Sequence, residues 1–183
     1  MLPVLVVLVA GVGVAAGYGL RELAARPAAG ATGTSPPPPA TTTAPAGEEP
    51  GPRAVQLAAD ARADPGSPAI QTLLQRHFDA INNRDFDAWQ STVTRQRAAT
   101  FPEQLWLDQY RSTTDGSILV HRIEPTTTGS VVLISFTSVQ ERELAPDQHS
   151  ACLRWRVSYA VVLERGELRL APSDPAASQY QAC

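Results

Sequence analysis

The pattern of apolar and polar positions predicts a long helix near the middle of the chain. Apolar side chains recur at spacings of three and four positions across residues 70–81, with polar residues between them. That spacing lines one face of an α-helix. Ser67 and Pro68 are typical of a helix start, as N-cap and first helical residue. Asn82-Asn83 is typical of a helix end.

Two shorter helices are expected after it. Asp85 is placed to cap a short helix that carries Phe86 and Trp89. A third helix is predicted to begin at Phe101-Pro102, with its larger side chains near one face. We expect Asp115-Gly116 to end this helix with a turn, because Asp-Gly is a common turn pair.

Beyond that turn the apolar pattern changes to a period of two, which is typical of β-strands. The predicted strands span residues 118–123, 131–139, 153–164 and 168–170. Arg165-Gly166 is expected to join the last two by a tight turn. Helices followed by a meander of strands predict an α+β domain, in which the helices pack on one face of a curved antiparallel sheet.

The longest predicted strand has two unlike faces. Large apolar side chains occupy alternate positions from Leu153 to Leu163, whereas Arg154, Arg156 and Ser158 lie between them. Successive side chains of a strand point to opposite faces of the sheet. We therefore expect the apolar face to meet the helices and the arginine face to meet solvent.

The N-terminus is apolar over a length that fits a membrane. Residues 2–20 contain no charged side chain, and about 20 apolar residues suffice to cross a bilayer. Residues 1–22 are therefore interpreted as a transmembrane helix or signal anchor. A cleaved signal peptide is the alternative, because Ala24 and Ala25 could form a cleavage site, although no basic residue precedes the run. Cleavage would make the protein secreted.

Residues 23–66 are predicted to form a disordered linker rich in Pro, Thr and Ala. Proline removes an amide donor, and the segment has few apolar side chains to bury, so ordering it would not repay the entropy. A weak amphipathic patch at residues 55–63 is expected to form at most a turn or two of helix. The folded domain is then assigned to residues 67–183.

The sequence carries conflicting signals for the side of the membrane on which the folded domain lies. Arg21 and Arg26 follow the apolar run and favour a cytoplasmic C-terminal side. The paired cysteines and the exported type of linker favour the opposite side. We therefore expect a single-pass cell-membrane protein with its domain outside the cytoplasm. The net charge of −3 and the scattered arginines give no basic surface for nucleic acid.

Cys152 and Cys183 are the chain's two cysteines, and no CxxC or Cys/His spacing indicates structural zinc. We expect them to form a disulfide that pins the C-terminal tail against the sheet; two buried free thiols are the alternative. A disulfide and an exported location support one another, because disulfides persist in oxidising compartments.

Two runs of the sequence resemble a known superfamily. The run SPAIQTLLQRHFDAINNRDFDAWQSTV resembles the opening helix pair of the NTF2-like (cystatin-like) superfamily, which includes SnoaL-like domains. The run CLRWRVSYAVVLERGELRL is similar to that superfamily's final strands. The resemblance covers about Ser67 to Ala171 and implies a cone of helices and sheet. It implies no function, because members include isomerases, dehydratases, cyclases and non-catalytic modules.

Enzymes of this superfamily place an Asp or a His-Asp pair inside the cone, where an apolar setting tunes the pKa. The candidates here are His77, Asp79, Asp108 and His121, of which His77 and Asp108 are carried forward. His77 lies on the helical apolar stripe, where packing is the simpler role; Asp108 and His121 are expected to face solvent. No GxSxG, P-loop or HExxH motif is present. We therefore lean towards a protein that is not an enzyme and expect no cofactor or metal.

Six aromatic side chains are predicted to line a pocket or to fill the core: Trp89, Trp106, Tyr110, Phe136, Trp155 and Tyr159. The leading hypothesis is a membrane-tethered, extracytoplasmic NTF2-like module that binds a protein partner or a small ligand at the cell envelope. One alternative is a SnoaL-like isomerase, cyclase or hydratase with an ionisable residue in the cone. Another is a homodimerising structural spacer.

Overall fold

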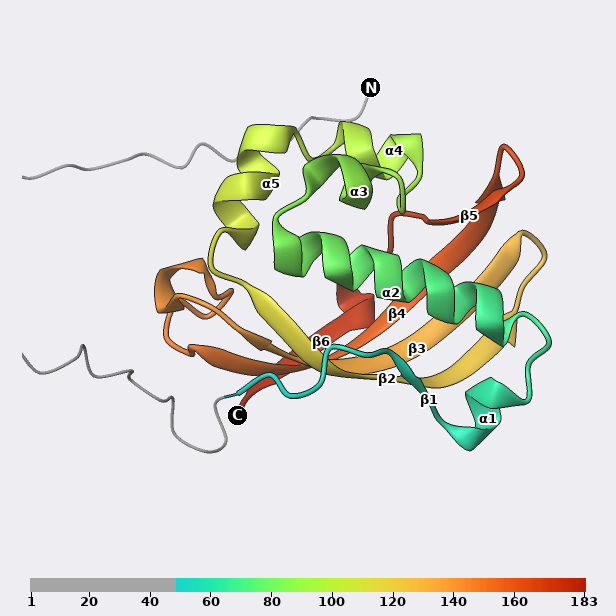
Figure 1. Cartoon of the computed structure of the whole chain (residues 1–183), viewed down its shortest axis with the longest axis horizontal. Helices are drawn as coiled ribbons and strands as arrows, with labels where there is room; N and C mark the ends of the chain where they lie inside the picture. The colour runs from blue at the N-terminus through green and yellow to red at the C-terminus, as the bar shows by residue number, and fades with distance from the viewer. Residues whose placement is uncertain (1–48) are drawn as a thin grey trace, which may run out of the picture. The chain divides into compact units, whose positions relative to one another are not determined.

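The computed structural model describes residues 49–183, in which helices pack on one face of a six-stranded sheet (Figure 1). The predicted transmembrane helix and most of the predicted linker lie outside these residues. Within the described range, no helix is long and apolar enough to cross a bilayer. The α+β class predicted from the sequence is confirmed.

The long helix α2 (Ser67–Asn83) carries the predicted apolar stripe on its buried face. Its ends differ from the prediction by one residue. Gly66 is the N-cap, so Ser67 is already helical and makes no side-chain cap, and Pro68 occupies the second position. Arg84 ends the helix in the left-handed conformation, with φ 57°.

Three short helices follow α2, and one of them was not predicted. Asp85 caps α3 (Phe86–Gln90) as expected, because its side chain accepts a hydrogen bond from the Ala88 amide. The helix α5 (Glu103–Tyr110) follows Pro102. Between them lies α4 (Arg95–Ala99), whose sequence has no apolar stripe; it is capped by Thr94.

The four predicted strands form an antiparallel meander in the predicted order. Their bounds are β2 (Thr114–Pro125), β3 (Gly129–Val139), β4 (Cys152–Glu164) and β5 (Glu167–Leu170). Arg165 and Gly166 join β4 to β5 with positive φ angles of 53° and 83°, which confirms the predicted turn. Short 3-10 helices occupy two of the loops, Arg142–Leu144 and Pro175–Ala177.

Asp115 and Gly116 do not form the turn that was predicted; both belong to β2. Asp115 pairs with Ser138 of β3, and the register shifts just beyond Gly116. A side chain at Gly116 would come within 2.4 Å of the Gly51 carbonyl oxygen. The glycine is therefore needed for the close approach of the segment that enters the domain.

Two strands were not predicted: β1 (Gln56–Leu57) and β6 (Ser178–Ala182). The short helix α1 (Ala59–Arg62) forms within residues 55–63, where a turn or two of helix was expected. Because β1 pairs with β2 in parallel, the sheet is mixed and not purely antiparallel. Gln75 of α2 accepts a hydrogen bond from the Val55 amide, and Val55 is buried. Residues 55–62, within the range predicted to be linker, are thus part of the folded domain.

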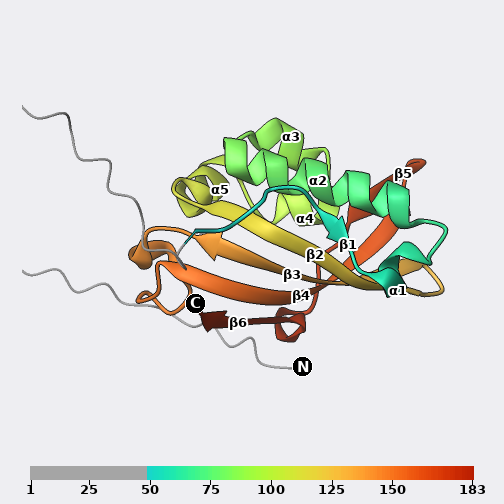
Figure 2. The ribbon, with the colours of Figure 1, turned by 60° about the horizontal axis from the view of Figure 1, so that its bottom comes forward.

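Two views of the molecule show how the sheet is covered. Helices α2 to α5 lie on one side of the sheet, and β6 runs beside β4 (Figure 2). The predicted inner face of β4 is buried at Leu153, Val157, Tyr159 and Val161. Leu163 departs from the prediction, since 67% of it is exposed near the end of the strand.

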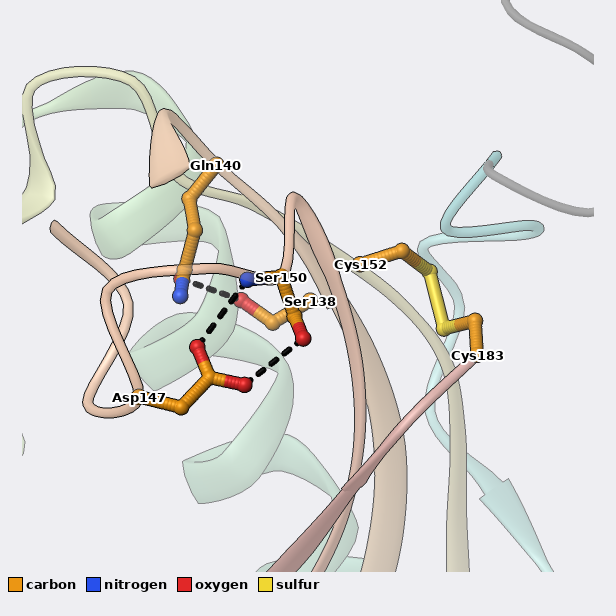
Figure 3. Close-up of a disulfide and its surroundings, with 6 residues drawn as sticks. All are labelled: Ser138, Gln140, Asp147, Ser150, Cys152 and Cys183. Atoms are coloured by element: carbon orange, nitrogen blue, oxygen red, sulfur yellow. Dashed lines mark hydrogen bonds between the residues drawn. A yellow bond between two sulfur atoms is a disulfide. The ribbon is translucent and has the colours of Figure 1, made fainter. Parts of the chain in front are cut away.

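Cys152 and Cys183 form the predicted disulfide (Figure 3). It joins the start of β4 to the last residue of the chain, next to the pairing of Leu153 with Ala182. The bond and β6 together hold the C-terminal tail against the sheet. The tail is thus a strand of the domain, although its sequence carries little strand pattern.

Candidate functional site

A cavity of about 470 Å³ lies between the inner face of the sheet and the short helices. Its wall comes from α2, α4, α5, β2, β3 and β4, together with the segment that leads into β6. The aromatic lining residues are Phe78, Tyr110, Phe136, Trp155 and Tyr159. The volume falls in the range typical of small-molecule sites.

The apolar wall of the cavity belongs to a longer row of rings that crosses three strands. Phe136, Trp155 and Tyr180 lie opposite one another on β3, β4 and β6. Their ring centroids are 6.1 Å apart for the first pair and 5.0 Å apart for the second. Phe78 of α2 packs edge-on against Phe136 at 5.0 Å. Phe78, Phe136 and Trp155 line the cavity and offer an aromatic surface to a ligand, whereas Tyr180 is not among the lining residues.

Asp115 places a carboxyl group on the wall of the cavity, where only 3% of the residue is exposed. Asn82 of α2 holds its backbone: the Asn82 side-chain amide donates to the Asp115 carbonyl at 3.0 Å, and the Asp115 amide donates to Asn82 Oδ1 at 2.7 Å. Among the described residues, Asp115 Oδ1 has no hydrogen-bond partner. The carboxyl is therefore fixed in place but only partly satisfied.

Burial raises the pKa of Asp115 to about 6. Contact with the Ser138 hydroxyl and the charge of Arg84 act in the opposite direction and are smaller effects. Desolvation disfavours the charged form of a carboxyl group. Asp115 can therefore exchange a proton near neutral pH, as a general acid or base must.

Arg97 of α4 supplies a positive charge to the same cavity. Its guanidinium lies over the Tyr159 ring, 5.4 Å from the centroid. Its Nη1 atom is buried and has no hydrogen-bond partner among the described residues. The ion pairs found in residues 49–183 all involve other arginines.

The two tyrosines and the histidine nearest to these charges are neutral. Burial, the largest cause, raises the pKa of Tyr110 and Tyr159 and keeps both hydroxyls protonated. Burial, followed by the charge of Arg97, lowers the pKa of His77 well below its usual value. Asp115 and Arg97 are therefore the charged lining residues withdrawn from solvent, whereas Asp174, the third charged lining residue, is exposed.

The candidate catalytic residues named from the sequence lie outside this cavity. His77 is 1% exposed, shares a hydrogen bond of 2.7 Å with Thr92 through Nδ1, and packs against aromatic rings. Asp108 is exposed and accepts a hydrogen bond from Gln104. Asp79 is half-buried and accepts a hydrogen bond from Gln75.

His121 lies on the other face of the sheet, where its Nε2 is 2.8 Å from Ser135 Oγ. It lines a second hollow of about 530 Å³ together with Arg154 and Arg156. This hollow is polar and has no acidic lining residue. The arginine face of β4 is thus exposed, as its alternation predicted.

The predicted pocket aromatics divide into two groups. Tyr110, Phe136, Trp155 and Tyr159 line the cavity, whereas Trp89 and Trp106 are fully buried in the core behind it.

Among the described residues, no group of three or more His, Cys, Asp or Glu side chains could hold a metal ion.

Sequence reasoning missed Asp115 and Arg97 as residues of the cavity. Asp115 was assigned to a turn because Asp-Gly is a strong local turn signal, and its strand pairing is not encoded locally. Arg97 lies in the short segment RQRAA, which has no apolar period and so no helix signal.

A scan against protein-family models found no match to this chain, and a search of the curated proteins found none either.

Proposed function

We propose that residues 49–183 form a small-molecule-binding domain whose ligand occupies the cavity beneath α4 and α5. The observation that carries this proposal is the pairing of an aromatic wall with lining residues that hold three buried, unpartnered polar atoms, Asp115 Oδ1, Arg97 Nη1 and Ser173 Oγ. Ligand sites combine apolar lining with a few convergent polar groups in this way. A domain that served only as a spacer would have no need of them.

The energetic reason is the cost of unpaired polar atoms. A buried donor or acceptor without a partner costs about 1–3 kcal/mol. Most such atoms in native proteins are satisfied, so two of opposite charge on one cavity wall call for an explanation. A ligand that hydrogen-bonds to Asp115 or Arg97 would recover part of this cost.

The location, the membrane tether and the superfamily that we propose for this domain come from the sequence predictions. We place the domain outside the cytoplasm, tethered to the cell membrane through residues 2–20, and assign it to the NTF2-like superfamily. The disulfide between Cys152 and Cys183 supports the location, because such bonds persist in oxidising compartments. The order of the elements, with α2 to α5 preceding the meander on one face of a sheet, supports the superfamily.

A second candidate function is catalysis, and Asp115 is the observation that favours it. A carboxyl group with a pKa of about 6 on the wall of an apolar cavity meets the basic requirement for proton transfer. This is the SnoaL-like alternative, with Asp115 in place of His77 or Asp108. An Asp115→Asn variant that binds a ligand but no longer converts it would favour catalysis; unchanged conversion would exclude Asp115 as the acid or base.

Ligand binding can be tested by equilibrium dialysis of the full-length chain in lipid nanodiscs, with empty nanodiscs as the blank. The probe is 2-naphthamide, a flat neutral aromatic that fits the cavity volume. We expect saturable binding that Gln109→Trp weakens, since Gln109 is an exposed lining residue on α5. Gln104→Trp is the matched control, on the same helix but outside the lining. Absence of saturable binding both of this probe and of its carboxylate analogue, 2-naphthoate, would refute the proposal.

The location has its own test, which is protease shaving of intact cells followed by non-reducing mass spectrometry of the released domain. We expect release of a domain in which Cys152 and Cys183 are joined. A protected domain with two free thiols would contradict the extracytoplasmic assignment.

A further inference from the structure

We propose that the natural ligand of the cavity is an apolar, ring-containing molecule with an anionic group such as a carboxylate, and that Arg97 binds this anion. The inference rests on the proposed ligand-binding function and specifies the chemical class of the ligand. It is carried by the geometry of Arg97, which lines the aromatic cavity, has an Nη1 atom without a hydrogen-bond partner and takes part in no ion pair among the described residues.

Arg97 is held in place by its neighbours and is not a free surface side chain. Thr94 caps α4, so the short helix projects Arg97 over the cavity. The guanidinium lies over the Tyr159 ring at 5.4 Å, a cation–π arrangement that restrains its plane. A restrained guanidinium loses little entropy when it binds a carboxylate through two parallel hydrogen bonds.

The protein provides no direct counter-charge for this guanidinium. In the described part of the chain, the carboxylates found in ion pairs are Glu124, Glu141, Glu164 and Glu167, each with another arginine. The nearby Tyr110 and Tyr159 stay protonated and so add no negative charge. Arg97 is half-buried and its Nη1 atom is buried, and withdrawing a cation from water is costly unless it is paired. An anionic ligand would supply the missing partner.

Asp174 also lines the cavity, but it is exposed and accepts a hydrogen bond from the Ala176 amide. Asp115 is the buried acidic lining residue, and the positive charge that acts on it is that of Arg84. Arg84 also donates to the Arg111 carbonyl at 3.1 Å, outside the cavity lining. Asp115 therefore repels an anion in the cavity and does not neutralise Arg97 by direct contact. The apolar body of the ligand would lie against Phe136 and Trp155.

The test compares two probes that differ in charge and little else. Binding of 2-naphthoate and 2-naphthamide is measured by equilibrium dialysis at pH 7.5, again with the full-length chain in nanodiscs and with empty nanodiscs as the blank. We expect the anion to bind more tightly than the amide. In Arg97→Gln the anion should bind roughly 10- to 100-fold more weakly, which is the usual size of a charge-assisted hydrogen bond, while the amide should bind nearly as before.

Matched variants separate recognition from structure. Arg95→Gln lies on the same helix with an exposed side chain, and it should leave both affinities unchanged. Asp115→Asn removes the negative charge from the cavity and should strengthen binding of the anion. If Arg97 served only to support the fold, Arg97→Gln would weaken both probes equally, which would overturn the inference.

The outcomes also distinguish this inference from the function on which it rests. Equal affinity of the wild-type chain for both probes would overturn the anionic class and leave small-molecule binding intact. Failure of both probes to bind would refute the proposed function itself.

Discussion

Asp115→Asn gives the most direct test of the charge chemistry in the cavity, because it removes a titrating group with little change in shape. Burial raises the pKa of Asp115 from its ordinary value of 3.8 to about 6. The difference of about 2 units corresponds to about 3 kcal/mol, at 1.36 kcal/mol for each unit. This is the amount by which ionisation of Asp115 weakens the folded state.

The sign follows from proton binding. Below pH 3.8 the folded and the unfolded chain both hold the Asp115 proton, so the folded state keeps its full stability. As the pH rises towards 6, the unfolded chain loses its proton first and the folded chain retains it. The free energy of unfolding therefore falls across this window and stays about 3 kcal/mol lower above it. Asparagine does not titrate, so this loss is absent from the variant.

The assay is equilibrium urea unfolding followed by tryptophan fluorescence at a series of pH values between 4 and 7.5. The chain's three tryptophans all lie in the described domain, so the full-length protein reports on it. The free energy of unfolding of Asp115→Asn, minus that of the wild type, should rise by about 2–3 kcal/mol across the series. Other titrating groups, such as Asp147 with its pKa lowered to about 2 by hydrogen bonds from Ser150 and His149, cancel in this difference.

A control variant removes the same charge from the surface. Asp108→Asn replaces an exposed carboxylate on α5, and its difference from the wild type should stay nearly flat with pH. A flat difference for Asp115→Asn as well would show that Asp115 does not titrate abnormally. That result would refute both the raised pKa and the role of Asp115 in acid–base chemistry.

Three further substitutions test the scaffold that positions the cavity. Cys183→Ser should lower the free energy of unfolding by about 3–4 kcal/mol, because the disulfide closes a loop with a sequence separation of 31; urea unfolding with and without reductant checks this. Asn82→Ala should cost about 1–3 kcal/mol and speed hydrogen exchange at the Asp115 amide; unchanged exchange would contradict the contact. Gly129→Ala would bring a side chain within 2.0 Å of the Val161 carbonyl oxygen and should lower the midpoint of thermal unfolding, whereas Ser130→Ala should not.

Features governed by local periodicity were predictable from the sequence. The apolar spacing across residues 70–81 determined α2 because a helix returns to the same face every three to four residues. Alternation along residues 153–164 predicted both faces of β4, and Arg165-Gly166 predicted the turn that follows. The two cysteines indicated the disulfide.

Features that depend on pairing with a distant segment were not predictable. The β1 and β6 strands are short and lack clear alternation, and they become strands only because β2 and β4 offer them an open edge. Asp115-Gly116 has the local character of a turn, but its pairing with Ser138 and the close approach of Gly51 place it in a strand.

The sequence by itself determined the α+β class, the longest helix, the meander and the cysteine pair, because each depends on residues close together in the chain or on composition. The candidate site was decided only by the tertiary structure. Arg97 lies on a short helix without an apolar stripe, and Asp115 lies on a strand that begins earlier than predicted. Neither residue has a local sequence signal of function. They are distinguished by lining the same cavity and by having polar atoms without partners. The cavity exists only after distant segments of the chain have packed together.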